Sequence, residues 1–134
     1  MIGVGIIGLG TVGRGTYEIL RQYGSLIQHK TGVDVRVVKI AEIDPARCQD
    51  LKNDGVQCVR DAYELINDAQ VDIVVELVGG TDAAYDYAAA ALKKGKWVVT
   101  ANKALLAEKG DALFSLAEEQ GGEIGFEASV CGGI

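Results

Sequence analysis

The sequence predicts an α/β fold with a doubly wound, mostly parallel sheet of about five or six strands and helices on both faces. Segments of strand length and segments of helical spacing alternate along all 134 residues. The strands are continuous β-branched runs rather than apolar–polar alternations, which is typical of a parallel sheet covered on both faces. No repeat, low-complexity tract or linker interrupts this order, so we expect one domain over residues 1–134.

The first half of the chain supplies two long strands and one long helix. Residues 2–9 are an apolar run of strand length, and apolar residues then recur at loose helical spacing from residue 11 to about 29. A second β-branched run covers residues 33–44. The polar stretch that follows predicts one short helix and then a short strand around 57–59.

The second half continues the alternation. Asp61 is expected to cap a short helix over 62–67, because an Asp side chain accepts hydrogen bonds from the free N–H groups at a helix start. Asp82 is expected to cap an alanine-rich helix that Lys93, Lys94 and Gly95 close. The remaining elements follow from the same patterns: strands over 71–80, 96–103 and 123–130, and a helix over 105–121.

Composition indicates a cytoplasmic globular protein. Apolar residues make up 49% and charged residues 24%, and the net charge of −6 argues against nucleic acid or an anionic membrane as a partner. No stretch approaches the ~18 apolar residues of a membrane span. The three cysteines form no C-x-x-C pair, so we expect a reducing compartment rather than a disulfide framework or a zinc site.

Gly8, Gly10 and Gly13 form a G-x-G-x-x-G pattern between a predicted strand and a predicted helix. In that setting the first glycine permits a tight turn, the second lets the backbone approach a pyrophosphate, and the third lets the helix pack closely on the sheet. Free N–H groups at the helix start also favour phosphate. The loop predicts a Rossmann-type dinucleotide site, and the alternative is a tight turn without a ligand.

An acidic residue at the end of the second strand is expected to bind the adenosine ribose, typically about 20 residues after the glycines. Glu42 and Asp44 are the candidates, and residues 24–34 lengthen the connection before them. Glu42 is favoured, because Asp44 precedes Pro45 and can form a turn. The absence of an arginine beside Glu42 favours NAD, but NADP stays open.

Three further strand ends carry candidate ligand contacts, since ligands of open α/β sheets bind outside the carboxyl ends of the strands. Gly79 and Gly80 allow close backbone approach to a ribose or nicotinamide; the alternative is a plain glycine turn. Lys103 can donate to a substrate or ribose oxygen, and the alternative is a surface lysine. Glu127 stands in apolar, glycine-rich surroundings, where the alternative is an interdomain or capping contact.

Four motifs in this order and spacing resemble the N-terminal nucleotide-binding domain of homoserine dehydrogenase: GIIGLGTVGRG, VVELVGG, VVTANKALLA and FEASVCGGI. The resemblance covers essentially the whole chain, and the last two motifs are more specific than the glycine loop. It implies NAD(P)-dependent interconversion of L-homoserine and L-aspartate 4-semialdehyde in threonine, methionine and isoleucine biosynthesis, by a cytoplasmic homodimer.

The resemblance also implies roles for single residues. The cofactor would be bound by Gly8, Leu9, Gly10, Thr11, Val12, Gly13, Glu42, Gly79, Gly80 and Lys103. Of these, Lys103 would reach both the cofactor and the substrate. A monovalent cation, commonly sodium, would be held by Glu127 and the backbone carbonyls of Val130, Gly132 and Ile134.

The apolar, glycine-rich end SVCGGI predicts a longer parent protein. The resemblance places the proton-transfer residues and most of the amino-acid pocket beyond residue 134, in a separate substrate domain. Hydride transfer needs both a positioned substrate and a proton donor, so the chain alone is expected to bind cofactor without turnover. Two alternatives stay open: the cofactor domain of another small-substrate oxidoreductase, and a non-catalytic dinucleotide-sensing domain.

Overall fold

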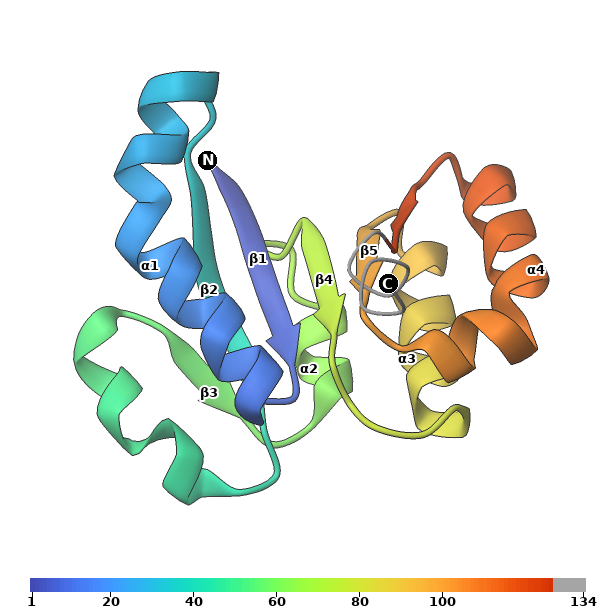
Figure 1. Ribbon diagram of the computed structural model, residues 1–134, viewed down its shortest axis with the longest axis horizontal. Coiled ribbons are helices and arrows are strands. Elements are labelled where there is room, and N and C mark those ends of the chain that lie inside the picture. Colours follow the sequence, from blue (N-terminus) through green and yellow to red (C-terminus); the bar gives the residue numbers. More distant parts are fainter. Residues whose placement is uncertain (127–134) are drawn as a thin grey trace.

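A computed structural model describes residues 1–126, except the side chains of residues 52 and 53, and contains one parallel sheet in the order β3-β2-β1-β4-β5-β6 (Figure 1). Its strands are β1 (Ile2–Ile7), β2 (Val35–Ala41), β3 (Gln57–Val59), β4 (Ile73–Glu76), β5 (Trp97–Thr100) and β6 (Ile124–Gly125). The helices are α1 (Thr11–Thr31), the 3-10 helix η1 (Pro45–Asp54), α2 (Ala62–Ile66), α3 (Asp82–Lys93) and α4 (Lys103–Gln120). The strand order reverses between β1 and β4, which confirms the predicted doubly wound, Rossmann-type fold.

Neighbouring residues of each central strand supply opposite layers of the core. Ile6 and Val75 pack on the side of α1 and η1, whereas Ile7 and Val74 pack on the side of α2, α3 and α4 (Figure 1). Both faces of the sheet centre are therefore buried. This explains why its strands are continuous apolar runs without polar alternation.

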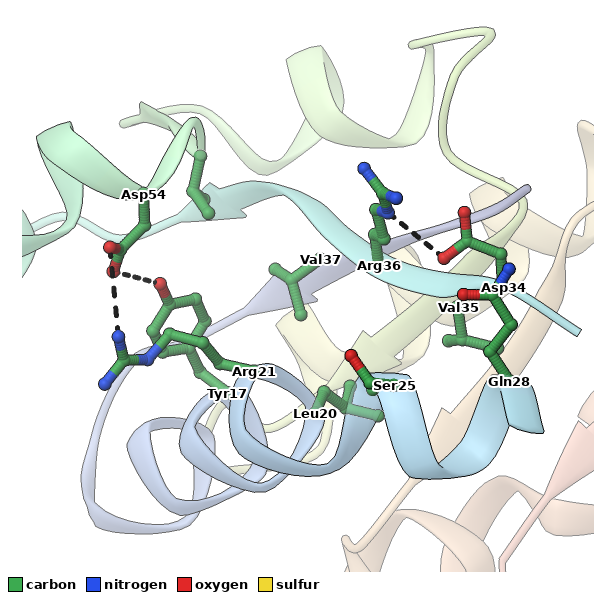
Figure 2. A pocket seen from close by; sticks show the side chains of 12 residues that line it. Tyr17, Leu20, Arg21, Ser25, Gln28, Asp34, Val35, Arg36, Val37 and Asp54 are labelled. Carbon is green, nitrogen blue, oxygen red and sulfur yellow. Dashed lines mark hydrogen bonds and ion pairs between the residues drawn. The ribbon is translucent and has the colours of Figure 1, made fainter. Parts of the chain in front are cut away.

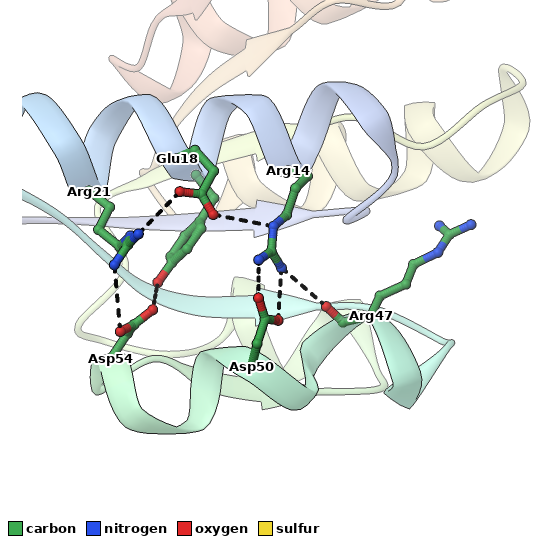
Figure 3. A network of polar contacts seen from close by, with 7 residues as sticks. Arg14, Glu18, Arg21, Arg47, Asp50 and Asp54 are labelled. Atoms are coloured by element: carbon green, nitrogen blue, oxygen red, sulfur yellow. Dashed lines mark hydrogen bonds and ion pairs between the residues drawn. The ribbon is translucent and has the colours of Figure 1, made fainter.

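Polar side chains dock η1 against α1 (Figure 3). Arg14 pairs with Asp50, and the Tyr17 hydroxyl donates to Asp54 Oδ2 at 2.6 Å. Burial, and then this bond to a carboxylate, raise the pKa of Tyr17. Arg21 also lies 3.9 Å from Asp54. These contacts hold the segment between β2 and β3 beside the first turns of α1.

Some predicted boundaries were wrong. The helix predicted from residue 11 to about 29 continues to Thr31 and ends at Gly32 in the left-handed conformation, so most of the segment 24–34 that lengthens the connection before β2 is helical and not extended. Asp82 does not cap α3: Thr81 is the N-cap residue, and Asp82 is the first helical residue.

The strands also end earlier than predicted. β4 stops at Glu76, paired with Ile7 on one side and Thr100 on the other, because β1 turns away at Gly8 and β5 ends at Thr100. The predicted strand over 123–130 is described only up to residue 126, where β6 spans two residues. In the described part of the chain, no helix is both long and apolar enough to cross a membrane.

Candidate functional site

The carboxyl ends of the central strands bring most of the predicted site residues to one edge of the sheet (Figure 1). Two cavities there share the segment 77–79 as a wall. The first, of about 480 Å³, is bounded by Gly8, Gly10 and Glu42, among others. The second, of about 390 Å³, is bounded by Val12, Asn102 and Lys103. The glycine loop therefore lies between two hollows of the surface.

Two loop glycines are required by the fold itself. Gly8 has a φ of +97°, a left-handed conformation that side chains rarely adopt, and its N–H donates to the carbonyl of Ala41 at 2.9 Å. A Cβ on Gly13 would lie 2.0 Å from the Gly8 carbonyl oxygen. These glycines let β1 turn sharply and let α1 begin directly against that turn.

Gly10 is different, because nothing in the fold requires a glycine there. Its φ of −78° and ψ of −159° suit any residue, and the atom nearest to an added Cβ is Arg47 Nη1, at 3.8 Å. Gly10 is also the N-cap of α1, and no side chain caps this helix start. The loop thus combines free N–H donors with open space beside them, which suits a phosphate group.

Glu42 lies directly after β2 and braces this loop. Its side chain is only 4% exposed, and its carboxylate accepts the N–H of Leu9 at 2.8 Å and that of Asp44 at 2.9 Å. Burial by itself would raise the pKa of Glu42, but these two bonds and the Arg47 guanidinium outweigh it and lower the pKa. A carboxylate has about four lone-pair sites, so Glu42 keeps acceptor capacity for a ribose hydroxyl.

Asp44, the other acidic candidate, serves the local backbone. Its side chain accepts the N–H of Ala46 at 3.0 Å and caps η1, with Pro45 in the first turn. It is therefore a helix cap, in keeping with the preference for Glu42 as the ribose ligand.

Lys103 is exposed at the second cavity, as the first residue of α4. The preceding residue, Asn102, caps α4 by accepting the N–H of Leu105 at 3.0 Å. The Asn102 amide also donates to the carbonyl of Gly80, which has a φ of +83°. The helix that carries Lys103 is thus tied to the loop that carries Gly79 and Gly80.

Glu76, which was not predicted from the sequence, lines neither cavity but binds the segment 77–79 that they share. It ends β4, is fully buried, and accepts the N–H of Val78 at 2.8 Å and the hydroxyl of Thr100 at 2.9 Å. Burial raises the pKa of Glu76, although both bonds oppose this shift. The available signal was one acidic residue inside the apolar run 71–80, just before the glycines.

The predicted cation ligands Glu127, Val130, Gly132 and Ile134 lie outside the described residues. Among residues 1–126, no group of three or more His, Cys, Asp or Glu residues could hold a metal ion.

A further cavity, of about 280 Å³, lies between α1 and β2 and contains none of the predicted site residues (Figure 2). Charged side chains at its rim already pair with each other: Arg36 with Asp34 at 3.0 Å, and Arg21 with Asp54. The predicted residues therefore gather at the carboxyl edge of the sheet and not beside this cavity.

Comparison with known proteins agrees with this geometry. Residues 8–127 match the family model described as the NAD binding domain of homoserine dehydrogenase. The chain is 39% identical over 133 residues to homoserine dehydrogenase of Neisseria gonorrhoeae and 38% identical over 133 residues to that of Bacillus subtilis. These alignments cover 99% of this chain but only 30% and 31% of the relatives, so the chain spans about a third of their length.

Solved structures give the same result. A crystal structure of S. aureus homoserine dehydrogenase matches with a TM-score of 0.87 and 37% identity, over 96% of this chain and 32% of that one. A hyperthermophilic archaeal homoserine dehydrogenase in complex with NADPH matches with a TM-score of 0.74 and 28% identity, over 96% of this chain and 44% of that one. The chain therefore belongs to the family of homoserine dehydrogenase NAD-binding domains.

Proposed function

We propose that this domain holds the dinucleotide in an enzyme that interconverts L-homoserine and L-aspartate 4-semialdehyde, a step towards threonine, methionine and isoleucine. The observation that carries the proposal is Gly10. The fold tolerates a side chain there, yet the position is a glycine between an uncapped helix start and a cavity. A phosphate approaching the backbone explains this choice of residue.

The residues around the loop take distinct roles in this proposal. The N–H groups from Gly10 to Gly13 receive the pyrophosphate, while Leu9, whose own N–H is bound by Glu42, shapes the loop. The Glu42 carboxylate accepts a hydroxyl of the adenosine ribose. Gly79 and Gly80 lie along the second ribose and the nicotinamide. A nicotinamide cofactor held there would supply or accept the hydride that the reaction requires. Lys103, an exposed cation beside Gly79, donates to an oxygen of the substrate or ribose.

The remainder of the activity is assigned to sequence outside this chain, since the matched relatives are about three times as long. We propose that this remainder binds the small amino acid and supplies the proton donor, in a cytoplasmic homodimer that binds neither nucleic acid nor membrane. The sodium site at Glu127, Val130, Gly132 and Ile134 belongs to the same proposal. Without the substrate domain, this chain binds the cofactor but does not convert homoserine.

Titration of the 134-residue chain with NADH and with NADPH, followed by nicotinamide fluorescence, tests the proposal. We expect binding of both nucleotides. The sequence predicted no arginine beside Glu42, but the Arg47 guanidinium lies 3.4 Å from that carboxylate at the same cavity, where it would offset the repulsion of a 2′-phosphate by Glu42. Homoserine oxidation by the chain should not exceed that of the Lys103→Ala variant. Turnover above that control would show that the chain is catalytically complete. Failure to bind either nucleotide would refute the assignment of the glycine loop.

A further inference from the structure

Glu76 is buried at the point where three parts of the carboxyl edge meet: the end of β4, the loop 77–81 and the loop between β5 and α4. We propose that Glu76 is a positioning residue for the nicotinamide end of the cofactor, because it sets the spacing between the Gly79–Gly80 loop and Lys103. This inference rests on the proposed function of the site.

The carboxylate links the two loops directly. One oxygen accepts the N–H of Val78, at the start of the glycine loop, and the other accepts the hydroxyl of Thr100, the last residue of β5. Because β4 and β5 are neighbouring parallel strands, these bonds join the points where the two strands end. A shift of either loop would stretch one of the bonds.

Asn102 completes a ring of hydrogen-bonded residues that consists of Glu76, Val78, Thr100 and Asn102. Its backbone N–H donates to Thr100 Oγ1 at 3.0 Å, and its side-chain amide donates to the carbonyls of Val78, at 3.5 Å, and Gly80. The same residue caps α4, so it fixes where Lys103 begins the helix. The path from Glu76 to Lys103 therefore consists of hydrogen bonds and one helix cap.

Among the side chains that the structure describes, none with a positive charge lies within ion-pair distance of the Glu76 carboxylate. Burying a carboxyl group in such a place costs free energy, which its hydrogen bonds offset only in part. A carboxylate can accept from both loops at once. A glutamine amide has one oxygen and one NH₂ group, so one of the two donors would lose its acceptor.

The ring touches one cavity more than the other. Val78 bounds both cavities, but Asn102 and Lys103 bound only the second cavity, whereas Gly10 and Glu42 bound only the first. Loosening the ring should therefore disturb the nicotinamide end and leave the adenosine end in place. This difference separates a positioning role from a general loss of structure.

The test compares NADH with ADP-ribose, which shares the adenosine, the pyrophosphate and both riboses but lacks the nicotinamide. Dissociation constants for both ligands are measured for the wild-type chain and for Glu76→Gln, with NADH fluorescence as the spectroscopic readout. We expect the ratio of the NADH constant to the ADP-ribose constant to rise about fivefold, the equivalent of one lost hydrogen bond. Glu42→Gln, the same substitution at the other end, should weaken both ligands and leave the ratio unchanged.

Thr100→Val removes the hydroxyl of the same link while keeping a β-branched side chain, and it should raise the ratio in the same direction. If Glu76→Gln does not fold, the Thr100→Val variant is used for the test instead. An unchanged ratio in the folded variants would overturn the proposal and leave Glu76 with a purely structural role. If the wild-type chain binds neither ligand, the proposed function itself fails, and this inference fails with it.

Discussion

Replacing Gly10 with alanine should weaken cofactor binding without harming the fold. Within the described part of the chain, the added Cβ would sit no closer than 3.8 Å to any atom beyond its chain neighbours, an ordinary van der Waals distance, and the backbone of Gly10 already suits alanine. Alanine also restricts the unfolded chain more than glycine does. We therefore expect the free energy of unfolding to stay within about 1 kcal/mol of wild type, or to rise by about that much.

Binding should respond very differently. The new methyl group would occupy space beside the uncapped start of α1, where a phosphate oxygen would approach the N–H groups. Loss of one hydrogen bond to a charged group costs about 1.5–3 kcal/mol, which corresponds to an affinity roughly 10- to 100-fold weaker. NADH titration measures the affinity, and thermal unfolding followed by circular dichroism measures the stability. Unchanged NADH affinity in a folded Gly10→Ala variant would refute the phosphate role of this loop.

Three further predictions concern the fold and its pH dependence. Gly13→Ala should lower the free energy of unfolding by about 1–3 kcal/mol or more, because its Cβ would meet the Gly8 carbonyl oxygen. Gly15→Ala should raise the free energy of unfolding by about 0.5–1 kcal/mol, because no described atom lies within 4 Å of the added Cβ. Urea unfolding of both variants measures the two changes. Because the pKa of Glu76 is raised in the folded state, wild type should lose stability relative to Glu76→Gln as pH rises above 4.5, and a constant difference between them would contradict the buried charge. The hydrogen bond from Lys39 lowers the pKa of Asp68, so the stability from this pair is present above pH 3.8 and lost as pH falls below it; Lys39→Met should lose less stability in acid than wild type does.

The sequence was sufficient to predict the parallel sheet and the glycine loop, because both depend on local patterns. Continuous apolar runs indicated that the strands are buried on both faces, and the spacing of Gly8 and Gly13 indicated a close approach between the strand and the helix. Strand ends were less predictable. β4 stops at Glu76 because its neighbour β1 has already turned away, and that pairing is not visible within the run 71–80 itself.

The polar network of the site could not be predicted for a similar reason. Glu42 was selected for its position after β2, but its bond to Leu9 joins residues 33 positions apart. Glu76 was overlooked because its partner Thr100 comes from another strand, 24 positions away. Apolar periodicity carries no information about such long-range hydrogen bonds between side chains.

Chemical-shift mapping of the backbone amides during NADH titration tests the central claim most directly, since it locates the ligand without any substitution. The account predicts the largest shifts at residues 8–13 and 78–80, with smaller ones at Glu42 and Lys103. Shifts confined to the opposite edge of the sheet, around the cavity of about 550 Å³ that Lys96 and Trp97 help to line, would contradict it.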